Sequence, residues 1–258
     1  MGLRKIFSML SMNQRGMSIA IDKKRQLLSR ELTQVFNRTV KYGPFAGMIF
    51  CEDYWWGSSD KGAMLLGIYE QEILNSIMSV PSKYKVFIDL GAADGYYSIG
   101  TLISKKFKVS YAFEMSAKGR DVIQKNAKLN NCGNKLHILG EATKNFYKDI
   151  SKKELASSVI LIDIEGAEFS LLDKDSFQNL RKSIIFIELH DWVSKDSKEK
   201  IAKLMSDAKP YFKISNITTT SRDLSKFPEL SNYPDSDRWL IASEGRPKLM
   251  TWLRLDPK

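Results

Sequence analysis

The sequence is poor in the residues and apolar runs that several protein classes require. Only two cysteines, Cys51 and Cys132, occur in 258 residues, too few for a disulfide framework or a cysteine-ligated metal site. No run of 18 or more apolar residues is present, which excludes a transmembrane helix. The first residues lack the apolar stretch of a secretory signal peptide, so we expect a cytoplasmic protein. At 43% hydrophobic and 27% charged residues, the composition is globular.

The positive net charge is concentrated at the N-terminal end. Residues 1–41 hold nine Lys and Arg residues against two acidic ones, which is +7 of the total of +10. A basic arm can bind an anionic membrane surface, a nucleic acid or an acidic partner, or it can be a solvated helix face. Peripheral contact with the inner membrane surface is one role that we consider for it.

Helices dominate the predicted N-terminal arm, residues 1–82. Apolar residues at positions 3, 6, 7 and 10 have helical spacing and predict a short amphipathic helix. Further helices are expected over residues 18–38 and 62–79, separated by a strand and loop in the aromatic stretch 45–56. The three aromatic residues 54–56 either pack the arm onto the domain or cover a binding site.

A different pattern begins near residue 83, where short apolar runs alternate with helical segments. This alternation predicts an α/β domain over residues 83–258, with a doubly wound, Rossmann-like, seven-stranded and mostly parallel sheet. A helix capped by Ser116 should extend to Asn130. The expected strands are residues 86–90, 109–113, 136–139, 159–164, 184–189 and 212–217, with an antiparallel edge strand at 239–243.

Acidic residues and glycines follow the first predicted strand. Glycines allow a ligand to approach the backbone closely, but the spacing is not the G-x-G-x-x-G fingerprint of dinucleotide sites. Two carboxylates make the loop a poor phosphate site and suit a ligand that carries an ammonium and a sulfonium instead. Asp89 has an alternative interpretation as a cap of the following helix. The candidate ligand contacts are Asp89, Gly91, Ala92, Asp94, Gly95 and Tyr96.

The second and third predicted strands also end in acidic residues. Glu114, followed by Met115, stands where a carboxylate can accept hydrogen bonds from both hydroxyls of a ribose. Glu141, followed by Ala142, is placed to accept a hydrogen bond from an adenine amino group, unless it is a surface residue. Because acids follow three strands in order, the sequence predicts a nucleoside-binding site.

The fourth and fifth predicted strands deliver several carboxylates and one of only two histidines. The residues are Asp163 and Glu165 after the fourth strand, and Glu188 and His190 at the end of the fifth. Such groups are rarely buried without partners, so this set is the candidate reaction site. Period-two geometry puts Glu188 and His190 on the same side of their strand. His190 could also be a structural histidine at a strand end.

These motifs together resemble the FkbM-type methyltransferases, a branch of the class I S-adenosylmethionine-dependent enzymes. The similar segments are residues 87–98, 162–168, 188–190 and 237–241. The resemblance implies S-adenosylmethionine as cofactor and O-methylation of a hydroxyl on a sugar, a glycan or another natural product. It also implies that Asp89, Gly91, Glu114 and Glu141 contact the cofactor, and that the acidic residues with His190 form the substrate-side site. Asp163 is a candidate for both sets.

Two chemistries could activate an acceptor hydroxyl at such a site. In the first, His190 takes the proton while Glu188 or Asp163 orients the ring or the hydroxyl. In the second, Asp163 and Glu188 hold Mg²⁺, which lowers the pKa of the hydroxyl directly, as in enzymes similar to catechol O-methyltransferase.

Two other functions remain as alternatives. The net charge favours a nucleic-acid methyltransferase, but the acidic residues after the fourth strand would repel phosphates, so we do not expect a nucleic-acid partner. The second alternative is a catalytically silent cofactor-binding scaffold.

Overall fold

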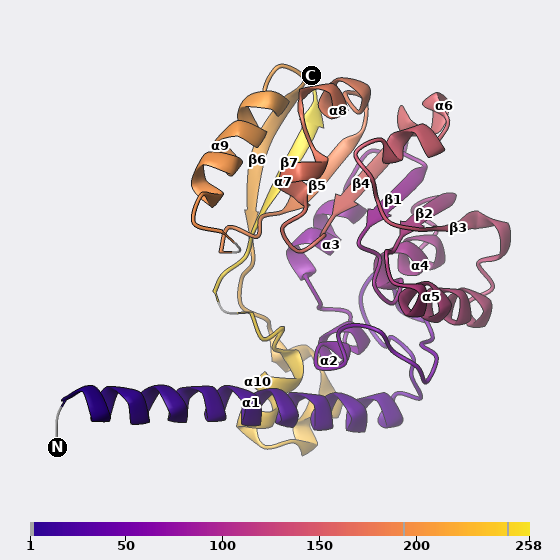
Figure 1. The fold of residues 1–258 in the computed structure, drawn as a ribbon. Helices are drawn as coiled ribbons and strands as arrows, with labels where there is room; N and C mark the ends of the chain where they lie inside the picture. Colours follow the sequence, from indigo (N-terminus) through magenta and orange to yellow (C-terminus); the bar gives the residue numbers. More distant parts are fainter. Residues whose placement is uncertain (1–2, 193, 247) are drawn as a thin grey trace.

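The computed structural model describes residues 3–192, 194–246 and 248–258, in which a seven-stranded sheet is flanked by helices (Figure 1). Its strand order is β3-β2-β1-β4-β5-β7-β6, with all neighbours parallel except the antiparallel pairs of β7 with β5 and with β6. The predicted doubly wound, mostly parallel sheet is therefore confirmed. The strands are β1 (Val86–Leu90), β2 (Val109–Phe113), β3 (Leu136–Leu139), β4 (Ser158–Ile162), β5 (Ile184–Glu188), β6 (Phe212–Thr218) and β7 (Thr251–Pro257).

Helices cover both faces of this sheet, because successive strand residues point to opposite faces and each face contributes to its own hydrophobic core. Phe87 and Phe186 point to one core and Ile88 and Ile187 to the other. The first core is closed by α3 (Gln71–Met78), α4 (Tyr96–Ile103) and α5 (Ala117–Leu129). The second is closed by η2 (Phe146–Asp149), α6 (Lys152–Leu155), α7 (Glu168–Leu171), α8 (Lys174–Asn179) and α9 (Ser197–Ala208).

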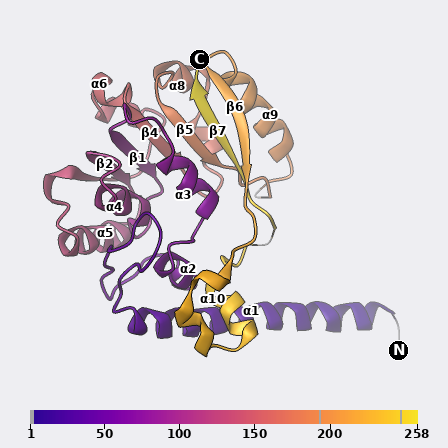
Figure 2. The same cartoon turned by 180° about the vertical axis from the view of Figure 1, so that it is seen from behind.

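A smaller helical group lies beside the sheet and combines N-terminal helices with the segment between β6 and β7 (Figures 1 and 2). In it α1 (Leu3–Val35) packs against α2 (Lys61–Leu65) and α10 (Asp235–Ala242), next to η3 (Leu224–Lys226) and η4 (Pro228–Asn232). The Arg25 guanidinium ties the group together by binding Asp60 and the Ser243 carbonyl. In both views the N-terminal half of α1 extends away from the rest of the molecule.

The N-terminal elements differ from the sequence prediction. One continuous helix replaces the two expected over residues 3–10 and 18–38, and it ends at Val35 because Asn37 and Arg38 adopt positive φ. The apolar face expected at positions 3, 6, 7 and 10 concerns side chains outside the described part of the structure. The helix expected over 62–79 is interrupted, since Gly67 and Glu70 also have positive φ and separate α2 from α3.

Two strand predictions are wrong. The stretch 45–56 forms no strand in the described structure beyond one isolated bridge between Thr39 and Ile49, and its backbone binds side chains of α5 instead. Residues 239–243 belong to α10 and its C-cap, and the seventh strand is β7, further along the chain. The apolar run 239–242 is too short to distinguish a helix from a strand, which explains this error.

The helix predicted after Ser116 is confirmed, and the Ser116 hydroxyl accepts a hydrogen bond from the Gly119 N–H. The short one-turn helix η1 (Gly133–Lys135) leads from α5 into β3. Within the described part of the chain, none of the helices combines the length and the apolar character that crossing a bilayer requires.

Candidate active site

A cavity of about 280 Å³ lies at the carboxyl ends of β1, β2, β3 and β4. This is the position at which open α/β sheets bind their ligands. The sheet supplies one side of the cavity, and the N-terminal segment supplies the other through Trp55, Trp56, Met64, Tyr69 and Glu70.

The structure brings most of the predicted cofactor contacts to this cavity. The residues that line it are Asp89, Gly91, Ala92, Asp94, Tyr96, Glu114, Met115, Glu141, Ala142 and Asp163. Gly95 is not among the described lining residues. It precedes α4 with φ of 82°, and a Cβ there would press on Ile99 and Ile123. Its role in the structure is to start the helix.

Gly91 allows the loop after β1 to pass directly over the end of β4. Its φ is 93°, and a Cβ at this position would lie 1.8 Å from the Asp163 carbonyl oxygen. Only glycine fits such a contact, because another residue would have to displace the backbone. The close approach places Asp163 beside the glycine loop, so the candidate cofactor and reaction residues share one cavity wall.

The Glu114 carboxylate is held by the backbone at the end of β2. Its Oε2 accepts a hydrogen bond from the Ala93 N–H at 3.0 Å, and its Oε1 accepts one from the Ser116 N–H at 2.7 Å. Each carboxylate oxygen has two lone pairs, so both can still accept from a ligand hydroxyl. The Glu114 carboxylate is therefore fixed at the cavity by the backbone.

Asp89 is buried at the end of β1, where its carboxylate accepts a hydrogen bond from the Ser98 hydroxyl. Burial disfavours the charged form and raises the pKa of Asp89 to about 7. A cationic ligand group in the cavity would favour the ionised form.

Asp94 is also buried, but its carboxylate already has three partners. Oδ1 accepts hydrogen bonds from the N–H groups of Trp55 and Trp56 at 2.8 and 3.1 Å. Oδ2 lies 3.4 Å from Nζ of Lys61, a buried lysine whose pKa burial lowers. Asp94 thus connects the glycine loop to the N-terminal segment.

His190 lies at the centre of the predicted reaction residues. Its Nε2 is 3.5 Å from Oδ1 of Asp163, 3.4 Å from Oε2 of Glu165 and 3.7 Å from Oε2 of Glu188. Its Nδ1 lies 3.3 Å from Oε1 of Glu168, a buried residue of α7 in the segment 162–168, for which the sequence predicts no individual role. Asp163 and Glu165 line the cavity, whereas Glu188 and His190 are not among the described lining residues.

Opposing effects act on the pKa of His190. Burial lowers it, but the carboxylates of Glu168 and Glu188 outweigh burial, so that the pKa lies above the ordinary value of 6.5. The histidine can therefore take up a proton readily.

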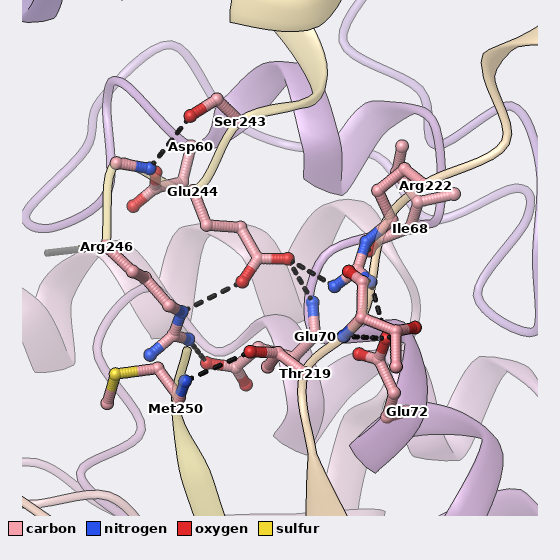
Figure 3. A network of polar contacts seen from close by, with 12 residues as sticks. Asp60, Ile68, Glu70, Glu72, Thr219, Arg222, Ser243, Glu244, Arg246 and Met250 are labelled. Atoms are coloured by element: carbon pink, nitrogen blue, oxygen red, sulfur yellow. Dashed lines mark hydrogen bonds and ion pairs between the residues drawn. The ribbon is translucent and has the colours of Figure 1, made fainter. Parts of the chain in front are cut away.

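A cluster of buried acids surrounds one guanidinium behind the cavity. Arg246 forms ion pairs with Glu70 before α3 and with Glu244 at 2.9 Å (Figure 3). It also forms an ion pair with Glu188 at the end of β5. Carboxylate oxygens of Asp163, Glu188 and Glu70 lie within 4.8 Å of one another. Sequence motifs gave no signal for Glu70 and Arg246, because both come from segments outside the strand ends.

Three acids in this cluster hold their protons more firmly than free carboxyls do. Burial is the main cause in each case, and mutual repulsion between the carboxylates adds to it. The pKa rises to about 7 for Asp163, to about 8 for Glu70 and to about 9 for Glu188. The cluster therefore retains a proton at neutral pH next to the cavity.

Two overlapping groups of described residues have ligand atoms close enough for a metal ion. One is Asp163, Glu165 and His190, and the other is Glu70, Asp163 and Glu188. The second contains both residues that the sequence offers for Mg²⁺. Two of its carboxylates, Glu70 and Glu188, already pair with the Arg246 guanidinium, which a divalent cation would have to displace.

The sheet order and the antiparallel β7 form the doubly wound, Rossmann-like arrangement that the sequence predicts. No protein-family model matches the chain. No curated protein matches it either.

Solved structures with a similar arrangement do exist. The chain is similar to the M1A22 tRNA methyltransferase TrmK of B. subtilis, at 11% identity over 71% of this chain and 64% of that one (TM-score 0.48). It is also similar to TYW2 of M. jannaschii in complex with AdoMet, at 14% identity over 76% of this chain and 77% of that one (TM-score 0.44). A third similar structure is the O-methyltransferase from Bacillus cereus in complex with SAH, at 14% identity over 69% of this chain and 76% of that one (TM-score 0.45). At such low identity, the likeness concerns the general arrangement of the chain.

Proposed function

We propose that this protein is an S-adenosylmethionine-dependent methyltransferase that methylates a hydroxyl group of a sugar, a glycan or another natural product. The observation that carries the proposal is the single cavity in which acids from three successive strands, Asp89, Glu114 and Glu141, line one space with Asp163. Negative groups around the cavity complement a ligand that carries both an ammonium and a sulfonium. In addition, the fixed carboxylate of Glu114 suits a ribose.

The bound cofactor supplies an electrophilic methyl group on sulfur. In the reaction, a bond forms between the acceptor oxygen and the methyl carbon while the carbon–sulfur bond breaks, and the hydroxyl loses its proton. This in-line displacement requires the acceptor oxygen at about 3 Å from the methyl carbon. The protein must therefore position the hydroxyl and accept one proton.

Asp163 and Glu165 are the residues of the reaction cluster that can meet the acceptor, because they line the cavity. His190 lies directly behind them with Nε2 within 3.5 Å of both carboxylates. We assign the hydroxyl contact to Asp163 and Glu165 and the proton to His190, whose Nε2 also lies 3.7 Å from Oε2 of Glu188. Arg246 keeps the neighbouring acids in place.

Calorimetry tests the cofactor directly. We expect heat of binding with S-adenosylmethionine and S-adenosylhomocysteine, and none with NADH or ATP. Binding of NADH or ATP in place of these ligands would refute the proposal. A panel of sugar and natural-product acceptors with a radiolabelled methyl donor then tests the transfer. Tight cofactor binding without any product from any acceptor would instead support a silent scaffold.

A nucleic-acid acceptor is the second candidate, favoured by the net charge of +7 on residues 1–41. Phosphate binding by such an arm depends strongly on salt. An RNA mobility-shift assay at 50 and 200 mM salt therefore distinguishes the candidates: a shift that is lost at the higher salt, together with methylated RNA, would replace the hydroxyl acceptor proposed above.

A further inference from the structure

Two tryptophans of the N-terminal segment stand against the cofactor cavity on a stretch without regular structure. Residues 51–60, all of them described, form only turns and bends. Trp55 and Trp56 line the cavity, yet the two residues remain 39% and 52% exposed. Large apolar side chains this exposed gain little from packing onto the protein alone, so their position needs another cause.

Hydrogen bonds to the backbone of residues 51–60 hold Trp55 and Trp56 in this position. Asp94 accepts the N–H groups of both tryptophans through a single oxygen, Oδ1, while its Oδ2 faces Lys61. Hydrogen bonds to an ionised acceptor are about twice as strong as neutral ones. The carboxylate is thus directed at the tryptophan backbone and at Lys61.

A second attachment reinforces the first. The Asn126 amide in α5 donates to the Asp94 carbonyl oxygen at 2.9 Å, and its Oδ1 accepts from the Cys51 N–H at 2.7 Å. Lys125, the preceding residue, pairs with Asp53 at 2.7 Å. The glycine loop, α5 and the tryptophan segment therefore form one connected unit.

The position of Trp55 relates this unit to the ligand. A Cβ added at Gly119 would come within 2.9 Å of both Cδ1 of Trp55 and Cδ of Glu114. The indole edge therefore lies beside the carboxylate that is suited to a ribose. Aromatic faces stack on nucleobases and sugars, so an indole here can cover a bound nucleoside.

We propose that Asp94 is a positioning residue whose hydrogen bonds hold Trp55 and Trp56 at the cavity, an arrangement that we call the clasp. We further propose that these two indoles contact the nucleoside of the cofactor and form one side of its binding site, which we call the aromatic wall. The proposal rests on the proposed function, and it replaces the expectation that Asp94 itself contacts the cofactor. It also gives the N-terminal segment a direct part in cofactor binding.

A double-mutant cycle on S-adenosylhomocysteine affinity tests the clasp. The variants are Asp94→Ala, the pair Trp55→Ala and Trp56→Ala, and all three together, each compared by calorimetry. We expect the Trp pair and Asp94→Ala each to raise Kd about tenfold, since stacking on one aromatic residue has an effect of this order. Adding Asp94→Ala to the Trp pair should then change Kd by less than about twofold.

Two results would overturn the clasp while leaving the proposed function intact. One is a further tenfold rise in Kd when Asp94→Ala is added to the variant that lacks both tryptophans, which would mean that Asp94 contacts the cofactor directly. The other is an unchanged Kd in the Trp pair. Trp239→Ala is the matched control, because Trp239 is equally exposed in α10 and is absent from the described cavity lining. If the wild-type protein does not bind S-adenosylhomocysteine, both the clasp and the proposed function are refuted.

Tryptophan fluorescence provides a test that does not depend on the stability of Asp94→Ala. The chain has five tryptophans. We expect S-adenosylhomocysteine to change the emission of the wild-type protein and of Trp239→Phe. The change should be absent when Trp55 and Trp56 are both replaced by Phe. A full change in that double variant would refute the aromatic wall.

Discussion

The imidazole Nδ1 of His190 lies 3.3 Å from Oε1 of Glu168, and the same oxygen accepts a hydrogen bond from the His190 backbone N–H at 3.1 Å. The other oxygen, Oε2, accepts from the Gly166 N–H at 2.9 Å. Glu168 is fully buried, so its carboxylate holds the Nδ1 proton and fixes the orientation of the ring. As a consequence, Nε2 faces the carboxylates at the cavity and is free to accept a proton.

Replacement of His190 by Ala should lower kcat by roughly 10²–10⁴-fold, the usual contribution of a general base. Because His190 is not among the described residues that line the cavity, the Kd for S-adenosylmethionine should stay within about twofold of the wild-type value. Steady-state kinetics and calorimetry on the same preparation check both values. Unchanged turnover would exclude His190 as the base.

Glu168→Gln should shift the pH profile of kcat. The Glu168 carboxylate raises the pKa of His190, so its neutralisation should lower that pKa and move the acidic limb of the profile to lower pH. A base of lower pKa is also weaker, and we expect a smaller plateau rate. A structural role alone would lower the amount of folded enzyme without moving the limb, which makes the profile the decisive measurement.

Removal of the central guanidinium should strongly destabilise the fold. Arg246→Met leaves Glu70 and Glu188 buried without their cation, and breaking a buried pair typically costs about 3–5 kcal/mol. Urea denaturation measures the change in the free energy of unfolding. Arg238→Met is the matched control, because its ion pair with Asp235 is exposed and should contribute less than about 1 kcal/mol. Equal effects of the two variants would refute the role of Arg246.

The site residues at the strand ends could be predicted from the sequence, whereas Glu70 and Arg246 could not. Parallel strands bring the residues at their carboxyl ends to one edge of the sheet, so the order of acids after β1, β2 and β3 predicted one cavity, which the structure shows. Glu70 and Arg246 reach the same place only through tertiary packing of segments far apart in the chain. No local spacing records such a contact.

Local structure limited the rest of the prediction. Hydrophobic periodicity identified the parallel strands β1 through β5 as short apolar runs with clear boundaries, and it also identified β6, which pairs antiparallel with β7. It placed the seventh strand in α10, where a run of similar length is helical. It also could not show that residues 51–56 bind α5 and Asp94 through their backbone, because these bonds depend on side chains distant in sequence.

Stability should fall as pH rises from about 5 to 9. The carboxyls of Asp89, Asp163, Glu70 and Glu188 have pKa values of about 7, 7, 8 and 9 in the folded protein, against ordinary values of 3.8 and 4.5. The folded state thus binds more protons than the unfolded state in this window, and the free energy of unfolding decreases with pH. Urea denaturation at pH 5.5, 7.0 and 8.5 measures this slope. Glu188→Gln should flatten it, and a free energy of unfolding that increases with pH would contradict the assignment.

Cofactor affinity should change with pH in the opposite direction. Asp89 lines the cavity and is largely protonated below its pKa of about 7, whereas a cationic ligand pairs with the ionised form. The Kd for S-adenosylmethionine should therefore decrease between pH 6.0 and 7.5, by up to about tenfold per pH unit well below the pKa, and binding at pH 6.5 should release a proton. Calorimetry in buffers of different ionisation enthalpy measures both effects. In Asp89→Asn, which carries no titratable group at this position, Kd should be weaker and nearly independent of pH. A pH dependence that persists in that variant would show that another acid of the cavity meets the cationic group of the cofactor.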